Sequence, residues 1–186
     1  MIDGATLIPK KVFFTKGVGK HQMRLQSFEL ALRKAGIEAC NLVRVSSILP
    51  PGCKVVSMSR GLAELNPGQV TFVVLADAST DEPSRMVGAG IGLAQPADGK
   101  HYGYISEHHG FGMTEERIAD MVEDMAATML ATTLGIEFDP KTAYDDRKEI
   151  YSMSGKIIRS RACVQTAEGD KDGLWTTVIA AAVFLL

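Results

Sequence analysis

The chain has 186 residues, of which 46% are hydrophobic and 23% are charged, and its formal net charge at pH 7 is -2. This length fits a single domain with a buried core, and this composition excludes an intrinsically disordered chain. The 20 basic and 22 acidic residues include no basic cluster, which argues against a nucleic-acid or membrane-surface partner.

The first predicted elements are a strand, a turn and a helix. Residues 11–15 are apolar enough for a strand, and the two glycines within 16–20 predict a turn or loop after it. Apolar residues recur at helical spacing over 25–35, and Gly36 stands where a C-terminal cap would end a helix. We therefore expect a short helix there.

The middle of the chain predicts several strands. Residues 41–45 alternate as a strand that cannot continue through the two prolines of 46–51. Residues 69–76 are apolar and β-branched, which is typical of a buried strand. Periodicity leaves 85–93 open between a strand and a helix with closely packed glycines, whereas 103–107 predicts another strand.

The last third predicts one long helix and two strands. Thr114 can cap a helix with one apolar stripe, and Gly135 closes it. The charged stretch 141–149 is expected on the surface, 156–164 predicts a strand, and 175–184 predicts a tightly packed final strand. Strands and helices are thus mixed without strict βαβ alternation, which favours the α+β class.

The sequence predicts neither a targeting signal nor a disulfide. The N-terminus lacks the basic and apolar regions of a signal peptide, and the apolar run 175–186 is too short to span a bilayer, so we expect a cytoplasmic protein. Cys40, Cys53 and Cys163 are odd in number and lack metal-ligand spacing, which favours buried, reduced thiols.

Ser46 and Ser47 stand between the predicted strand 41–45 and the two prolines. By themselves, such hydroxyls most often bond to nearby backbone groups at a strand end. The segment 41–51, however, resembles the self-processing site of the pyruvoyl-dependent arginine decarboxylases, in which a strand ends in a Ser-Ser pair, an aliphatic pair and two prolines. The resemblance covers most of the chain, through segments 28–32, 35–37 and 103–107 and the Ala-rich final strand.

This resemblance implies a single domain, 1–186, with the four-layer αββα sandwich of the pyruvoyl-dependent histidine and arginine decarboxylases. It also implies a homotrimer with active sites between neighbouring subunits. The implied reaction is the decarboxylation of L-arginine to agmatine and carbon dioxide by a covalent pyruvoyl group, with no metal ion.

Self-processing of this kind has a defined chemistry. The Ser47 hydroxyl attacks the carbonyl of Ser46 to give an ester, and β-elimination then cuts the chain. Hydrolysis of the resulting dehydroalanine leaves the pyruvoyl group at position 47, between a β chain of residues 1–46 and an α chain of residues 47–186. The resemblance assigns Asn41 as a hydrogen-bond donor that supports this cleavage.

Two carboxylates complete the implied site. Glu107 takes the family's catalytic position and would return a proton to the former α-carbon of the substrate; the alternative is an exposed glutamate at a strand end. Glu29 would accept the guanidinium of arginine, at a position where the family usually has aspartate. The alternative for Glu29 is a solvated helix residue.

Other interpretations remain beside this one. The glycines of 88–92 lack the spacing of a dinucleotide-binding loop, and the adjacent His108 and His109 point to opposite faces of a strand, which disfavours a metal site. Rival functions are a pyruvoyl decarboxylase of another amino acid and an unprocessed, non-catalytic oligomeric binding protein of the same fold. A serine hydrolase is disfavoured because no GxSxG motif surrounds Ser47.

Overall fold

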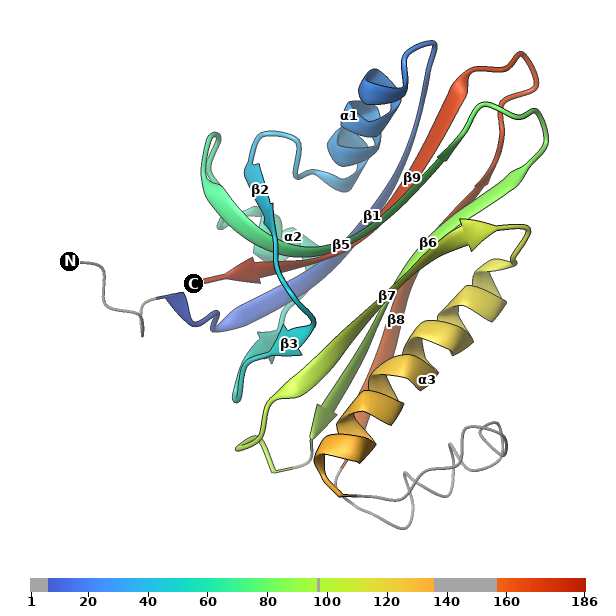
Figure 1. The fold of residues 1–186 in the computed structure, drawn as a ribbon. Coiled ribbons are helices and arrows are strands. Elements are labelled where there is room, and N and C mark those ends of the chain that lie inside the picture. Colours follow the sequence, from blue (N-terminus) through green and yellow to red (C-terminus); the bar gives the residue numbers. More distant parts are fainter. Residues whose placement is uncertain (1–6, 97, 136–156) are drawn as a thin grey trace.

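Two β-sheets and three helices make up the described part of the fold (Figure 1). The computed structural model describes residues 7–96, 98–135 and 157–186, without the side chains of 157–159. The five-stranded sheet has the order β2-β5-β9-β1-β4, that is Asn41–Arg44, Val70–Thr80, Trp175–Leu185, Lys11–His21 and Lys54–Val55. The four-stranded sheet has the order β3-β7-β6-β8, that is Ile48–Leu49, Gly103–Phe111, Met86–Pro96 and Ile157–Glu168. The helices are α1 (Arg24–Ala35), α2 (Met58–Leu62) and α3 (Glu115–Thr133).

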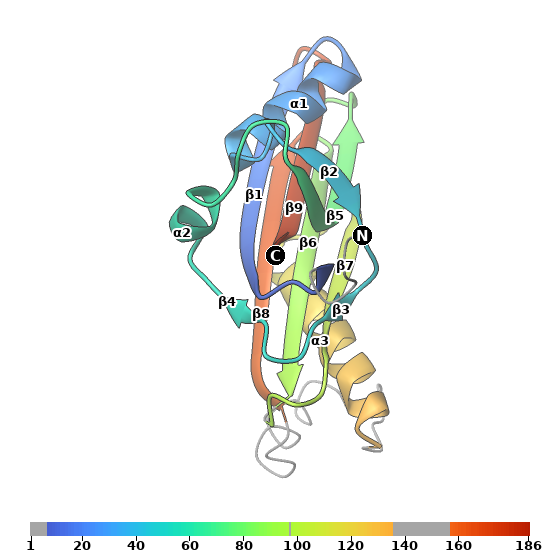
Figure 2. The ribbon, with the colours of Figure 1, turned by 90° about the vertical axis from the view of Figure 1, so that its left-hand side faces the viewer.

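The two sheets pack face to face, and each carries a helix on its outer face (Figures 1 and 2). Val74 of β5 and Ile91 of β6 belong to one fully buried apolar cluster between the sheets. Ala31 of α1 packs with the outer face of the five-stranded sheet, and Ile118 of α3 packs with that of the four-stranded sheet. The predicted α+β class is confirmed by this mixture of sheets and helices.

The turn predicted over 16–20 is wrong, because strand β1 continues through His21. A Cβ atom on Gly17 would lie 2.1 Å from the Ala31 carbonyl oxygen, and one on Gly19 would lie 2.2 Å from that of Ser27. The two glycines therefore let the backbone of α1 rest directly on the strand, and they do not mark a turn.

Strand β6 settles the open choice over 85–93 in favour of a strand. A Cβ atom on Gly90 would lie 2.5 Å from the Ile118 side chain, and one on Gly92 would lie 2.1 Å from the Val122 carbonyl oxygen. These glycines pack closely against α3, so the rejection of a dinucleotide-binding loop is supported by their surroundings.

The two long helices confirm the predictions from periodicity and capping. Gly36 ends α1 in a left-handed conformation, with φ of 77°, and the Thr114 hydroxyl accepts from the Arg117 amide at the start of α3. The short elements β3, β4 and α2 were not predicted, and β5, β6, β7 and β8 each continue beyond the residues expected for them. The stretch 141–149 lies outside the described residues. Among the described helices, none is long and apolar enough to cross a bilayer.

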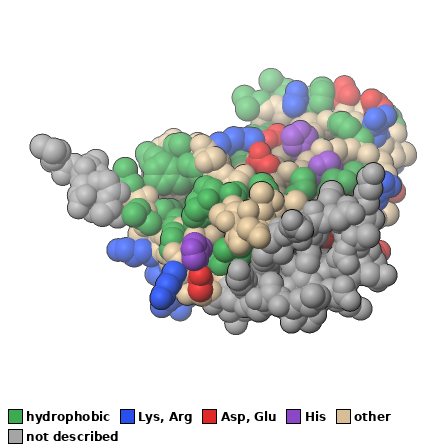
Figure 3. Space-filling view, turned by 60° about the horizontal axis from the view of Figure 1, so that its bottom comes forward, with side chains coloured by type: hydrophobic (Ala, Val, Ile, Leu, Met, Phe, Trp, Pro, Cys, Tyr) green, Lys and Arg blue, Asp and Glu red, His purple; other side chains and the backbone are tan. Residues whose placement is uncertain are grey.

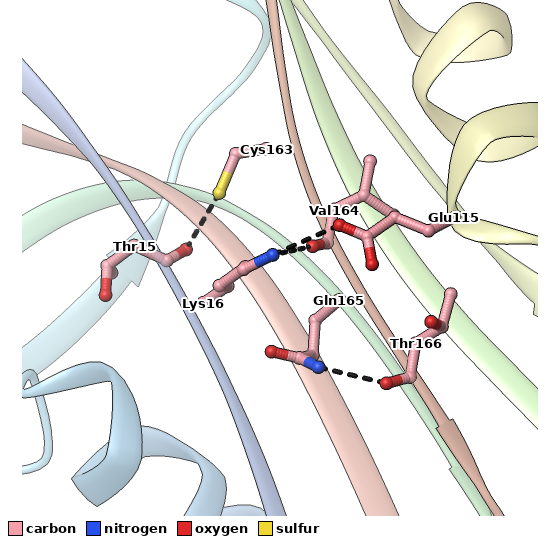
Figure 4. Close-up of polar contacts among 7 residues, drawn as sticks. All are labelled: Thr15, Lys16, Glu115, Cys163, Val164, Gln165 and Thr166. Carbon is pink, nitrogen blue, oxygen red and sulfur yellow. Dashed lines mark hydrogen bonds and ion pairs between the residues drawn. The ribbon is translucent and has the colours of Figure 1, made fainter.

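Polar contacts join the two sheets along one side (Figure 4). Lys16 of β1 donates from Nζ to the Val164 carbonyl of β8 (2.7 Å) and pairs with Glu115 at the start of α3 (3.2 Å). The Cys163 thiol donates to the Thr15 carbonyl (3.5 Å), and burial raises the pKa of this thiol. Strands β2 and β3 lie on the other side, each at an edge of its own sheet.

Candidate functional site

The Ser46–Ser47 peptide bond lies where the chain passes from one sheet to the other. On the five-stranded side, the Val45 amide donates to the Val73 carbonyl (3.0 Å) just after β2. On the four-stranded side, the Ser47 carbonyl accepts from the Ile105 amide of β7 (2.7 Å) just before β3. The bond thus connects two segments that are each fixed to a different sheet, as the path from β2 to β3 shows (Figures 1 and 2).

The carbonyl oxygen of Ser46 already has a hydrogen-bond donor. The Ile48 amide donates to it at 2.9 Å, which closes a three-residue turn around Ser47. A donor at this oxygen would stabilise the negative charge that develops there if the Ser47 hydroxyl attacked the carbonyl carbon. This donor could not be predicted from the sequence. Every residue except proline has a backbone amide, and only the backbone conformation decides which amide lies at the Ser46 carbonyl.

Glu107 lies on the strand that holds Ser47. It follows Ile105 by two positions on β7, so both side chains lie on the same face of the strand, and the two residues are separated by roughly 7 Å along it. Ile105 is fully buried, whereas Glu107 is exposed. The structure therefore brings a solvent-accessible carboxylate to the neighbourhood of the Ser46–Ser47 bond.

Asn41 and Glu29 lie elsewhere in the same chain. The Asn41 side-chain amide donates to the Gly68 carbonyl (2.8 Å) at the far end of β2, and five residues of mostly extended chain, roughly 16 Å, separate it from Ser46. Glu29 forms an ion pair with Arg33 on the surface of α1, apart from β3 in both ribbon views (Figures 1 and 2). Neither side chain therefore reaches Ser47 within one subunit.

Apolar side chains are exposed around the crossing. Val43, Val45 and Ile48 flank the two serines and are 40%, 37% and 40% exposed, and Val70, paired with the start of β2, is 57% exposed. Hydrophobic side chains also gather left of centre in the space-filling view (Figure 3). Exposed apolar groups beside a polar site are typical of a surface that contacts another protein chain.

Among the described residues, His108 and His109 belong to no group of His, Cys, Asp and Glu side chains that could hold a metal ion. His108 Nε2 is buried and has no hydrogen-bond partner among these residues. Burial, followed by the adjacent His109, lowers the pKa of His108, so the ring is neutral at neutral pH.

The three cysteines are unpaired. Cys53 is buried, and burial raises the pKa of its thiol to about 11. Cys53 therefore carries a protonated and unreactive thiol at neutral pH. Its burial matches the expectation of a reduced core cysteine, whereas Cys40 and Cys163 are only half-buried.

Comparison with known proteins gives one consistent family. The family model for pyruvoyl-dependent arginine decarboxylase matches residues 11–186. A protein of Chloroherpeton thalassium, named "Probable pyruvoyl-dependent arginine decarboxylase", is 61% identical over 180 residues, which cover 97% of this chain and 99% of that protein. "Pyruvoyl-dependent arginine decarboxylase 2" of Methanosarcina mazei is 56% identical over 179 residues, which cover 96% and 98% of the two chains. The similarity thus extends over nearly the whole chain in both relatives.

Proposed function

The chain belongs to the pyruvoyl-dependent arginine decarboxylase family, and on this basis we propose that it converts L-arginine to agmatine and carbon dioxide with a pyruvoyl group made from its own Ser47. The observation that carries the assignment to Ser47 is the geometry of the crossing between the sheets. The Ser46–Ser47 bond is fixed on both sides, and the oxygen that must become negative during cleavage already accepts from the Ile48 amide.

Cleavage begins when the Ser47 hydroxyl attacks the Ser46 carbonyl carbon and displaces the Ser47 nitrogen, which leaves an ester in place of the amide. Removal of the Cα proton of residue 47 then expels the Ser46 carboxylate and breaks the chain. Water replaces the nitrogen of the resulting dehydroalanine, which releases ammonia. The Ile48 amide stabilises the first step, because its hydrogen bond strengthens as charge develops on the Ser46 oxygen.

A pyruvoyl group, once formed, supplies a carbonyl that stabilises the electron pair left on the substrate's α-carbon when carbon dioxide departs. The residues around position 47 suit such a group, since the carbonyl of that residue is already held by the Ile105 amide. We assign Glu107 as the proton donor to the former α-carbon of the substrate. Its place on β7, two residues from Ile105, supports this assignment.

We further propose that the fold is the four-layer αββα sandwich of this family and that a homotrimer completes the active site. Two face-to-face sheets, each with a helix on its outer face, support the first proposal. The exposed Val43, Val45 and Ile48 beside the serines support the second. In this arrangement, Asn41 and Glu29 of a neighbouring subunit approach Ser47, where Asn41 supports cleavage and Glu29 accepts the guanidinium.

We also propose a cytoplasmic location for the enzyme. The unpaired state of Cys40, Cys53 and Cys163 supports this location, because reducing compartments keep thiols reduced.

Purified protein is expected to run as two pieces of about 5 and about 15 kDa under denaturing conditions, in proportion to the lengths of residues 1–46 and 47–186 in a 20.0 kDa chain. The two pieces should co-elute under native conditions, because β1 in the small piece pairs with β9 along all of Lys11–His21. Intact mass and native chromatography measure both results. The same sample, given L-arginine, should release agmatine.

Three outcomes would contradict the proposal, and the first two would point to another function. A chain that stays whole after long incubation and releases no agmatine supports the unprocessed binding protein. A processed chain that releases the amine of lysine or ornithine faster than agmatine supports a decarboxylase of another amino acid. A whole chain that still decarboxylates arginine excludes the pyruvoyl mechanism.

Glu29→Gln is expected to raise KM for arginine and leave cleavage intact. The charge-assisted hydrogen bond to a guanidinium, worth roughly 1.5–3 kcal/mol, would be replaced by a neutral one. Binding of this kind persists in the ground state and in the transition state, so kcat should change less than KM. Steady-state kinetics of the processed variant measure both values.

Glu29→Asp is the matched control, because it keeps the charge and should preserve the use of arginine. Co-assembly of Glu29→Gln with Ser47→Ala subunits tests the shared site: if Glu29 acts across the boundary, mixed trimers regain sites with wild-type KM. Unchanged arginine kinetics in Glu29→Gln would return this residue to the solvated surface of α1.

A further inference from the structure

The parallel ladder between β2 and β5 stops before the next carbonyl of β5 that could accept a backbone amide. The amides of alternate residues donate to β5: Asn41 to the Gln69 carbonyl (2.8 Å) and Val45 to the Val73 carbonyl (3.0 Å). In a parallel ladder this series continues in steps of two residues, so the next bond would join the Ser47 amide to the Leu75 carbonyl.

Arg44 occupies that acceptor. Its Nη1 donates to the Leu75 carbonyl (3.0 Å), and its Nη2 binds the Asp77 carboxylate two residues further along β5. The planar guanidinium can make both bonds at once, which a lysine ammonium on a shorter reach does less well. Ser47 is bonded instead to the other sheet, through its carbonyl and the Ile105 amide.

The two possible conformations of Ser47 exclude one another. Continued pairing with β5 would require extended dihedral angles at Ser47, whereas the bond from the Ile48 amide to the Ser46 carbonyl requires a turn there. A group that competes with the Ser47 amide for the Leu75 carbonyl therefore also favours the turn that places a donor on the Ser46 carbonyl.

We propose that Arg44 is a positioning residue for self-cleavage: it takes the Leu75 carbonyl, ends β2, and directs the Ser46–Ser47 bond into the turn in which that bond is cut. This inference rests on the proposed function, because it assumes that the chain cleaves at this bond. Arg44 acts before the pyruvoyl group exists, so it should affect the rate of processing and leave the turnover of processed sites unchanged.

The test compares the cleavage rates of freshly synthesised chains, followed by intact mass. Arg44→Met keeps the length of the side chain and removes its donors, and it should slow cleavage on the order of tenfold or more, since misplacement of reacting groups costs up to about 10²-fold. Arg44→Lys should recover part of the rate because it restores one donor. Arg85→Met is the matched control, since Arg85 also pairs with a carboxylate, Glu82, and should cleave at the wild-type rate.

A second measurement separates positioning from a general loss of structure. In the Ser47→Ala background, where no chain is cut, Arg44→Met should increase the hydrogen-exchange protection of the amide at position 47, which then pairs with the Leu75 carbonyl. A merely structural role for Arg44 would lower that protection.

Each outcome bears on a separate claim. Wild-type cleavage rates in Arg44→Met, or lowered protection at position 47, would overturn the role of Arg44 and leave the proposed function standing. Failure of the wild-type chain to cleave would overturn the proposed function itself. If Arg44→Met does not fold, Asp77→Asn takes its place, because it removes the carboxylate that binds the Arg44 guanidinium. Asp77→Asn should slow cleavage to a smaller extent. A wild-type cleavage rate in this variant would overturn the proposal.

Discussion

Ser47→Ala is expected to keep the protein as a single 20.0 kDa chain and to reduce arginine decarboxylation to the background of the assay. The substitution removes the hydroxyl that attacks the Ser46 carbonyl, and it also removes the oxygen that must be lost in β-elimination, so neither step has a substitute. Because the pyruvoyl group derives from this residue, loss of cleavage and loss of activity should coincide. Denaturing electrophoresis, intact mass and agmatine release measure the two effects on one sample.

Ser46→Ala is the matched control for this experiment. Ser46 takes part through its carbonyl group, which accepts from the Ile48 amide, and its own side chain is exposed. A chain with Ser46→Ala should therefore still cleave and decarboxylate arginine. Cleavage between positions 46 and 47 in Ser47→Ala would place the nucleophile elsewhere, and activity in an uncut chain would remove the pyruvoyl group from the mechanism.

The end of a strand near the two serines could be predicted from the sequence, and β2 does end at Arg44. The expected cause was different, because Pro50 and Pro51 follow β3, where the chain pairs again at Ile48–Leu49. The helices α1 and α3 could be predicted because periodicity and caps such as Gly36 are local signals.

The crossing between the sheets could not be predicted from local signals. Whether Ser47 pairs with β5 or with β7 depends on strands that follow it by more than twenty residues, and no periodicity in 41–51 records that choice. Gly17 and Gly19 predicted a turn for a similar reason: the sequence does not show that a helix backbone rests on them.

The separation of Asn41 and Glu29 from Ser47 is also a tertiary feature. Sequence resemblance assigns roles to these residues without stating which subunit contributes them. Asn41 bonds to the Gly68 carbonyl and Glu29 to Arg33 within its own chain, so their proposed roles require a second copy. If these roles hold, the distances in one chain call for at least a second copy, whereas the number of three subunits in the proposal comes from the resemblance alone.

Glu107→Gln is expected to separate processing from catalysis. In the proposed mechanism, cleavage precedes the formation of the pyruvoyl group and depends on Ser47, the Ile48 amide and Asn41, so this variant should cleave at least in part. Decarboxylation then requires a proton for the former α-carbon, and an amide of the same size cannot provide it. Loss of a general acid typically lowers the rate by about 10²–10⁴-fold, so kcat should fall by this order while KM for arginine changes little.

The control is Glu168→Gln, which changes another exposed glutamate on the same sheet. Glu168 lies at the end of β8, where it pairs with Met86, far along the sheet from the crossing. Its cleavage and turnover should equal those of the wild type. Rates must be expressed per pyruvoyl group, counted from the mass of the 47–186 fragment, because incomplete processing would otherwise imitate a loss of kcat. Near-normal turnover per pyruvoyl group in Glu107→Gln would show that another group donates the proton. Glu107 would then be only a solvated residue in the middle of β7.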